Sequence, residues 1–408
     1  MPKITMYFQV HQPLRLRKFS IFDEHSGPMM REYFDEELNR KILHRVATKC
    51  YYPANNIMLE LLNRYDGRFK VAYSISGSLL EQAKLYEPHL IESFQKLADT
   101  GHVEFLCETY YHSLSSLWPK KDEFYEQVRM QKKLIEELFS YTPKTFRNTE
   151  LLFSTDIAKL SENCGFKGIL AEGIEHVLGW RSPNFVYKAR GSDTRILFRN
   201  YRLSDDVAYR FSAKWWGEYP LTADKYALWL SKVKGQTINL FMDYETFGEH
   251  HWADTGIFDF LKHFPEYALR HPDLSFSHPH ETVKLKPADE IDVLWAISWA
   301  DIERDSSAWL GNKMQHMCFE LLQKLEGPVR ELDDPEYYGV WRYLQNSDHL
   351  YYLCTKSLAD GDVHKYFSPY GDPFDGFVTF INILHDFKDR IDRKLKEKQA
   401  KEKKNKRK

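Results

Sequence analysis

Short apolar runs alternate with amphipathic stretches through about the first 280 residues of this chain, and this alternation limits the folds open to it. Helical spacing of apolar residues separates the runs, for example over 124–139. Strands that alternate with helices indicate parallel βαβ units, so we expect an α/β fold. The runs predicted as strands lie at 4–10, 69–76, 103–106, 167–170 and 237–242.

Polar residues follow several of these runs directly. The run over 237–242 leads into Asp243, Glu245 and a His-His pair, and the first run leads into His11 and Gln12. In a parallel barrel the carboxyl ends of all strands lie on one rim, so we expect such side chains to converge there. Desolvated acids have shifted pKa values and indicate a functional site; a solvated loop is the alternative for 238–252. Other acids within or after strands are Glu104, Glu150 and Glu172.

The pattern changes after Pro287, where long helices replace the alternation. We therefore predict a barrel over 1–289 and a helical region over 290–398. The end of the chain is strongly basic, with ten Lys or Arg against two Glu from residue 393 onward. We predict that residues 399–408 form a disordered tail.

Composition narrows the possible partners and compartments. Outside the basic tail the chain is acidic, which argues against nucleic acid as the main partner; RNA or membrane contact through the tail is a minor alternative. The five scattered cysteines are typical of reduced thiols in a cytoplasmic protein. The N-terminus lacks a signal-peptide pattern, and no apolar run reaches the roughly 18 residues of a membrane span.

Convergent carboxylates suit two kinds of chemistry: binding of divalent cations and hydrolysis of glycosidic bonds. A histidine-rich metal site is the weaker prediction, because neither H-x-x-x-H nor H-E-x-x-H occurs. His250 and His251 would point to opposite faces of a strand, although His278 and His280 could share one face. We therefore expect no metal and no other cofactor.

Five segments, in this order, resemble the motifs of glycoside hydrolase family 57, the α-amylases with their 4-α-glucanotransferase and branching-enzyme relatives. The five segments span about three quarters of the chain. Their residues are most similar to the motifs of the α-amylase branch of the family. One departure is that many relatives have Trp-Leu before the acid of the third motif. The segments are His11-Gln12-Pro13, Gly101-His102-Val103-Glu104, Phe146-Arg147-Asn148-Thr149-Glu150, Met242-Asp243-Tyr244-Glu245-Thr246-Phe247-Gly248 and, at 299–312, WADIERDSSAWLGN.

The resemblance implies a distorted TIM-like (β/α)7 barrel, followed by a C-terminal helical region that contributes to the active-site cleft. It also implies α-1,4-glucan substrates such as starch, glycogen or maltooligosaccharides, retention of anomeric configuration, and no catalytic metal. Glu150 maps onto the nucleophile and Asp243 onto the general acid/base. Glu245 would share a face with Asp243 and could raise its pKa.

Further residues are expected to bind substrate, each with a structural alternative. His11 and Glu104 would recognise hydroxyl groups of the substrate. The structural alternative is a buried core histidine for His11 and a salt-bridge partner for Glu104. Trp309 would stack on a sugar face or pack between domains. The fifth motif leaves its acid open between Asp301 and Asp305. The full set is His11, Gln12, Glu104, Glu245, His250, Asp301, Asp305, Trp309, Trp215 and Trp216.

The predicted function is therefore an α-amylase-like glycoside hydrolase of carbohydrate metabolism. A 4-α-glucanotransferase or a branching enzyme on the same fold is the alternative. A metal-dependent polysaccharide deacetylase and a non-catalytic glucan-binding protein are weaker ones. The sequence leaves the oligomeric state open.

Overall fold

The computed structural model describes residues 1–23, 27–356 and 368–405, and these form two compact units. The barrel unit comprises Met1–Gln12, Arg40–Tyr110 and Lys121–Trp299. The helical unit comprises Pro13–Asn39, Tyr111–Lys120 and Ala300–Lys408. The predicted single boundary near residue 290 is thus replaced by an interleaved division, in which two early segments join the C-terminal part.

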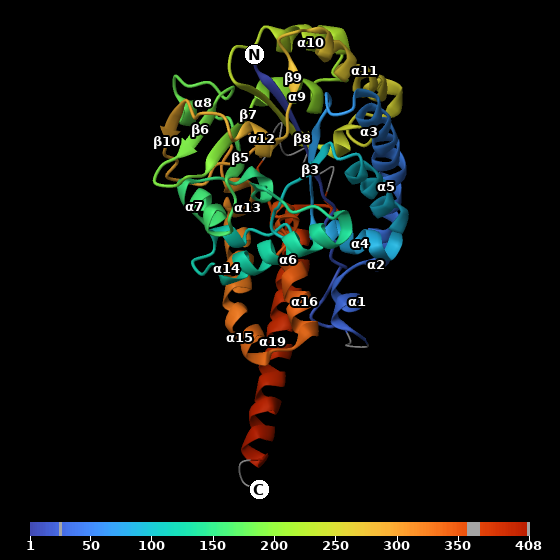
Figure 1. The fold of residues 1–408 in the computed structure, drawn as a ribbon. Coiled ribbons are helices and arrows are strands. Elements are labelled where there is room, and N and C mark those ends of the chain that lie inside the picture. Colours follow the sequence, from blue (N-terminus) through green and yellow to red (C-terminus); the bar gives the residue numbers. More distant parts are fainter. Residues whose placement is uncertain (24–26, 357–367, 406–408) are drawn as a thin grey trace. The chain divides into compact units, whose positions relative to one another are not determined.

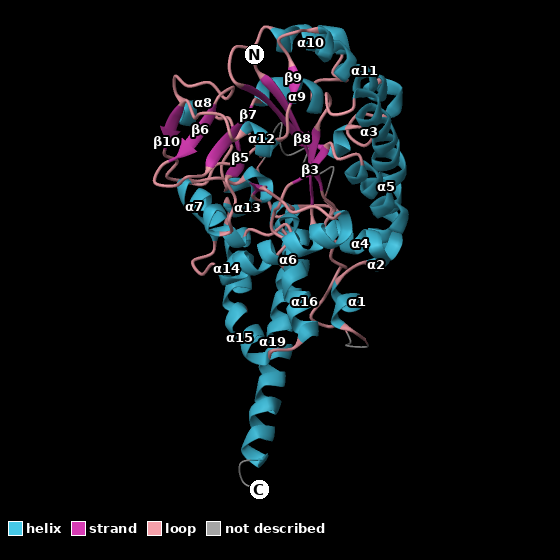
Figure 2. Cartoon of the chain, viewed as in Figure 1, coloured by secondary structure: helices cyan, strands magenta, loops and turns pink. Residues whose placement is uncertain are grey.

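Two five-stranded sheets build the barrel unit (Figures 1 and 2). In the first the strand order is β3-β2-β1-β8, all parallel, with β9 also paired to β1. In the second β4, β5 and β7 are parallel, while β6 runs antiparallel to β7 and pairs with β10. The bounds are β1 (Lys3–Val10), β2 (Val71–Ile75), β3 (Val103–Phe105), β4 (Thr145–Arg147), β5 (Gly168–Glu172), β6 (Val186–Ala189), β7 (Arg195–Arg199), β8 (Thr237–Asp243), β9 (Ser275–Phe276) and β10 (Asp289–Ile291).

Two seams join the sheets into a barrel. At one seam the backbone of Cys107 bonds to both Thr145 and Arg147, at 3.0 and 2.9 Å. At the other, Asn239 Nδ2 donates to Phe198 O at 2.8 Å. Seven parallel strands, β1 to β5 with β7 and β8, therefore close into the distorted (β/α)7 barrel that the family resemblance implied.

Helices α4 and α9 of the barrel unit each follow a strand and begin at a polar cap. Ser76 follows β2, and its side chain accepts a hydrogen bond from Leu79 N at the start of α4. Asn200 likewise follows β7 and caps α9. Such caps satisfy amide groups that a helix N-terminus leaves unpaired. The main helices are α3 (Tyr52–Tyr65), α4 (Gly77–Tyr86), α5 (Pro88–Asp99), α6 (Asp122–Phe139), α7 (Thr155–Asn163), α9 (Tyr201–Ala208), α10 (Ala223–Ser231) and α11 (Ile257–Arg270).

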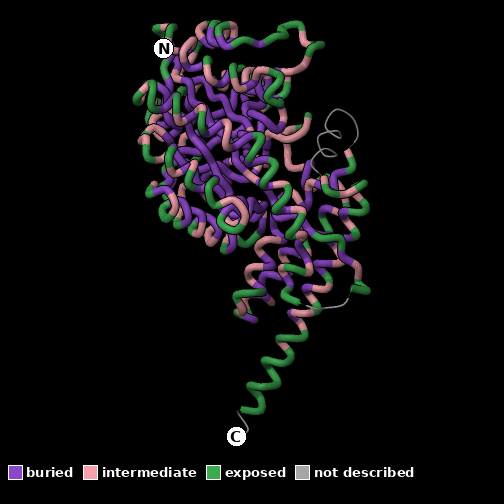
Figure 3. The backbone as a smooth tube through the Cα atoms, turned by 90° about the vertical axis from the view of Figure 1, so that its right-hand side faces the viewer, coloured by how far each residue is buried: buried purple, intermediate pink, exposed green. Residues whose placement is uncertain are grey.

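The helical unit is built around α19 (Pro373–Asn405). Its buried side chains include Phe380, Phe387 and Ile391, at helical spacing, and Phe387 lies against Tyr33 from the early segment. Helix α19 continues as far as Asn405, and its end is exposed (Figure 3); the predicted disorder from residue 399 stays a prediction. Residues 406–408 lie outside the described part. Other helices are α1 (Met29–Tyr33), α13 (Ser307–Leu310), α14 (Lys313–Lys324), α15 (Glu326–Leu332), α16 (Pro335–Leu344) and α17 (Ser347–Tyr351).

Over the described ranges, no helix combines the length and apolar character needed to cross a membrane. The contribution of the helical unit to a substrate cleft stays a prediction.

Candidate active site

Asp243 and Glu150 both lie at carboxyl ends of barrel strands. Asp243 is the last residue of β8, is half-buried, and is in register with Gln9 of β1. Glu150 follows β4 by three residues, in a 3₁₀ turn over Thr149–Leu151. Because β4 and β8 belong to one parallel barrel, the two acids are on the same rim, as predicted.

The backbone of Glu150 adopts a left-handed conformation, with φ 56° and ψ 30°. This region is uncommon for residues other than glycine, and such strain gathers at functional sites. Three hydrogen bonds from neighbouring residues hold the turn. Trp299 Nε1 donates to Glu150 Oε2 at 2.8 Å, Ser298 Oγ donates to Glu150 O at 2.7 Å, and Asn148 Nδ2 donates to Leu152 O at 3.0 Å.

Two arginines flank the Trp299 ring. The guanidinium carbons of Arg147 and Arg199 lie 4.9 and 5.9 Å from its centre. Arg147 is fully buried, and across the described residues no hydrogen-bond partner was found for its three guanidinium nitrogens. A desolvated guanidinium over an indole face is attracted to the ring electrons. Nothing in the local sequence had singled out Arg147, Arg199 or this role for Trp299.

Arg199 has carboxylate partners. Its Nη1 donates to Glu172 Oε2 at 3.1 Å, and its Nη2 to Asp205 Oδ1 at 2.5 Å. Burial alone would lower the pKa of Arg199, but the two carboxylates outweigh that effect and raise it. Glu172, which the sequence placed on the rim, is thus paired in a buried ion cluster.

Glu245 is almost completely buried beside Asp243. Its Oε1 accepts a hydrogen bond from the Tyr51 hydroxyl, and Gln12 Nε2 lies 3.5 Å from the same oxygen. Burial raises the pKa of Glu245 to about 8, and the charge of Asp243 adds to the increase. The sequence had predicted that Glu245 raises the pKa of Asp243, and that effect stays a prediction; the structure shows a raised pKa for Glu245 itself.

Histidines near the rim have different surroundings. His11 Nδ1 lies 2.6 Å from the hydroxyl of Ser76, the residue that caps α4. Burial, with a smaller contribution from His251, lowers the pKa of His250 to about 4. His251 Nε2 donates to Ala208 O at 3.0 Å, which gives it a structural role.

Glu104 does not reach the rim. It is the fully buried middle residue of β3, and its Oε2 accepts bonds from His280 N and Nδ1, both at 2.9 Å. His280 belongs to α12 (Pro279–Thr282), and Ser277 just before α12 bonds to Ile4 at the start of β1. Glu104 therefore faces the amino ends of the strands, which contradicts its predicted contact with substrate and agrees with the salt-bridge alternative.

The acid that does follow β3 on the rim side is Glu108, which the sequence analysis missed. It is fully buried, and its Oε1 accepts hydrogen bonds from Gln9 Nε2 at 3.0 Å and Ser74 Oγ at 2.5 Å. Gln9 is the residue in register with Asp243. A usable signal was present, because Glu108 follows the end of β3 by three residues, as Glu150 follows β4.

The fifth motif begins at Trp299 in the barrel unit, and its other residues lie in the helical unit. Asp301 pairs with Lys356 Nζ at 3.2 Å, and Asp305 Oδ1 accepts from Ser307 N at 2.8 Å at the start of α13. Trp309 is 1% exposed and lies against Tyr351. The buried ring has no exposed face for the predicted stacking on a sugar, and its contact with Tyr351 lies within the helical unit, not between domains as the alternative had it.

Trp215 and Trp216 do not form an exposed pair. Trp215 is 81% exposed, whereas Trp216 packs edge-on against Trp229 and under the guanidinium of Arg210. Trp215 alone offers a free aromatic face. Its binding role, and those of His11, Gln12, Glu245, His250, Asp301 and Asp305, stay predictions.

Comparison with known proteins identifies relatives over most of the chain. The family model for glycosyl hydrolase family 57 matches residues 5–294. A Methanocaldococcus jannaschii protein described as "Putative alpha-amylase" is 47% identical over 395 residues, which cover 94% of this chain and 84% of that protein. The α-amylase of Pyrococcus furiosus is 27% identical over 146 residues, 36% of this chain and 21% of that one.

Solved structures show the same fold at low sequence identity. The branching enzyme of Pyrococcus horikoshii superposes with a TM-score of 0.71 at 14% identity, over 97% of this chain and 91% of that one. The 4-α-glucanotransferase of Thermococcus litoralis gives 0.66 at 15%, over 86% and 56%. The predicted family and barrel are thus confirmed, and the chain belongs to glycosyl hydrolase family 57.

Proposed function

We propose that the protein is a retaining, α-amylase-like hydrolase of α-1,4-glucans, with Glu150 as nucleophile and Asp243 as general acid/base. The observation that carries the proposal is the position of both acids on one barrel rim, with Glu150 held by Trp299. The identity to an amylase-like relative over nearly the whole chain supports the substrate class.

In the first step, ionised Glu150 attacks the anomeric carbon while Asp243 gives its proton to the leaving glycosidic oxygen. The bond from the anomeric carbon to that oxygen breaks as the bond to the Glu150 carboxylate forms. The indole N–H of Trp299 orients the attacking carboxylate. In the second step Asp243 takes a proton from water, and the resulting hydroxide displaces Glu150 with net retention.

Glu245 fits this scheme as a charge regulator. Burial and the charge of Asp243 both raise the pKa of Glu245, so the two adjacent acids share a proton and only one of them needs to be negative at a time. The Tyr51 hydroxyl, which donates to Oε1, fixes its orientation. Asp243 can therefore change its protonation state during the cycle without facing a second fixed negative charge at Glu245.

The test uses Glu150→Gln and Asp243→Asn, which keep side-chain shape. Release of reducing ends from maltoheptaose should fall at least about 10³-fold in each. Asp254→Asn, at an exposed acid, is the matched control and should retain full activity. Normal turnover by either rim variant, with unchanged circular dichroism, would exclude its assigned role.

The product profile separates hydrolysis from the transferase alternative. Chromatography of maltoheptaose digests should show shorter maltooligosaccharides, and proton NMR should show α-anomers first. Longer chains as main products would indicate a 4-α-glucanotransferase, and new α-1,6 signals a branching enzyme.

A further inference from the structure

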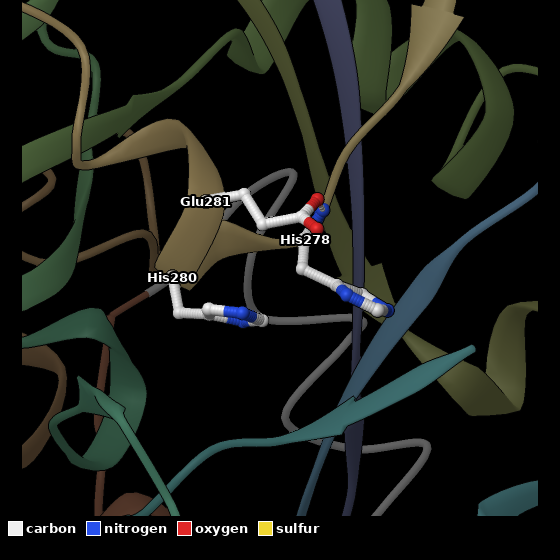
Figure 4. A group of neighbouring side chains, drawn as sticks. All are labelled: His278, His280 and Glu281. Carbon is white, nitrogen blue, oxygen red and sulfur yellow. Dashed lines mark hydrogen bonds between the residues drawn. The ribbon is translucent and has the colours of Figure 1, made fainter. Parts of the chain in front are cut away.

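A cluster of two imidazoles and a carboxylate lies at the amino ends of the barrel strands. Donor atoms of His278, His280 and Glu281 all lie within 4.8 Å of one another. Figure 4 shows the two imidazole rings on the same side of α12, and their centres are 5.4 Å apart at an interplanar angle of 23°. The short helix α12 brings the three side chains together, because it places residues 278, 280 and 281 within one turn.

Both rings are held by their other nitrogen atom. His280 Nδ1 bonds to Glu104 Oε2 at 2.9 Å, and His278 Nε2 donates to His102 O at 2.9 Å. Histidines that bind metals characteristically donate their second ring nitrogen to a carboxylate or backbone carbonyl, which fixes the tautomer. The ring nitrogens that remain as possible metal ligands are therefore His280 Nε2 and His278 Nδ1. His278 Nδ1 also accepts in the α12 capping box, so an ion would replace that amide partner.

Glu104 adds negative charge behind the cluster. It is fully buried, and its Oε1 has no hydrogen-bond partner within the described part of the chain. Glu281 Oε1 pairs with Lys70 Nζ at 2.7 Å, and its Oε2 accepts from His278 N at 3.1 Å. Lys70 thus pairs with Glu281, whereas the charged-group partner of Glu104 is His280, so a cation bound by His280 would offset the charge of the buried Glu104 carboxyl group.

An ion can reach the cluster from solvent. A pocket of about 550 Å³ opens over it. His280 and Glu281 expose 17% and 31% of their side chains. Besides the three residues of the cluster, the basic residues Arg68, Lys70 and Lys144 line the pocket.

We propose that His278, His280 and Glu281 form a site for a divalent ion of the zinc type, on the barrel end opposite to Asp243. Two imidazole nitrogens and one carboxylate oxygen suit zinc and its transition-metal neighbours, whereas Mg²⁺ and Ca²⁺ prefer oxygen donors throughout. Tetrahedral binding requires donors about 3.4 Å apart, so small side-chain rotations would contract the cluster around the ion. The bound ion would fasten α12 to β3 through His280 and Glu104.

The first experiment titrates ZnCl2 into the full chain, without a histidine tag and after dialysis against EDTA. Calorimetry should show one equivalent bound, and saturation should raise Tm by about 3 °C. Saturation with MgCl2 should leave Tm unchanged. Absence of saturable zinc binding, or an equal shift with Mg²⁺, would overturn the proposal.

Variants then locate the site. His280→Ala and Glu281→Gln should each weaken zinc binding at least tenfold, while His316→Ala, at an exposed histidine on α14, should bind as the parent does. Unchanged binding in both site variants would refute the assignment. If these variants do not fold, Co²⁺ is added to the parent protein instead. Tetrahedral Co²⁺ with nitrogen ligands gives visible absorption bands, and the absence of these bands would refute the proposed site.

Discussion

Replacing Glu245 by Gln should remove a large part of the pH dependence of stability. In the unfolded chain this carboxyl has a pKa near 4.5, and in the folded protein burial raises it to about 8. Between these values the native state binds more protons than the unfolded state, so stability falls as pH rises. Gln keeps an acceptor for the Tyr51 hydroxyl and cannot ionise.

The size of the effect follows from the two pKa values. One group shifted from 4.5 to about 8 should lower the free energy of unfolding by about 2 to 3 kcal/mol between pH 5.5 and pH 7.5. Urea unfolding at both pH values should show this loss in the parent protein, and Glu245→Gln should lack that component. Other groups titrate in the same range, so the difference between the two proteins is the quantity to measure.

Two further variants sharpen this test. Glu136→Gln, at an exposed position on α6, should retain the parent pH dependence. Asp243→Asn removes the charge that adds to the shift and should give an intermediate dependence. An equal loss of stability in the parent and in Glu245→Gln would show that Glu245 is not held protonated, and would refute the charge-regulator role.

Three more variants probe contacts described above. Trp299→Phe removes the donor to Glu150, so kcat on maltoheptaose should fall about 10- to 100-fold with little change in KM; an unchanged kcat would contradict the orienting role. Glu108→Gln replaces a charged acceptor of two hydrogen bonds and should lower kcat/KM without altering far-ultraviolet circular dichroism; parent-like kinetics would exclude Glu108 from the site. Trp309→Ala should destabilise the protein by about 3–5 kcal/mol, measured by urea unfolding, and a loss of activity at full stability would instead favour the sugar-stacking role.

Local patterns were sufficient to predict the main strands of the barrel and the position of Asp243. Strands such as β1 and β8 are buried on both faces and therefore appear in the sequence as continuous apolar runs. The motif around Glu150 was also visible, because an acid follows a short strand. These features depend on neighbours in the sequence, and the structure confirms their placement.

Other parts depend on contacts between distant residues. The second motif pointed to Glu104 and Glu108 was missed, because it takes the pairing of Cys107 with Phe146 of β4 to show that the chain is still at the barrel wall just before Glu108. Arg147 lies in a short strand, and nothing in that strand indicates a role at the site. Its role becomes visible from its contact with the ring of Trp299, which is distant in the sequence. Trp309 is an aromatic residue whose burial depends on Tyr351 and the rest of the helical unit.

The interleaved division of the chain limits the use of truncated forms of the protein. The polypeptide passes between the two units five times, so neither unit is a continuous stretch of the gene. A protein ended at Trp299 would keep residues 13–39 and 111–120, yet lose the aromatic and aliphatic surface that buries Tyr33, Phe34 and Trp118. Exposed apolar segments of this kind promote aggregation. The barrel can therefore be studied only within the whole chain, and point substitutions, not truncations, are the suitable means to assign its chemistry.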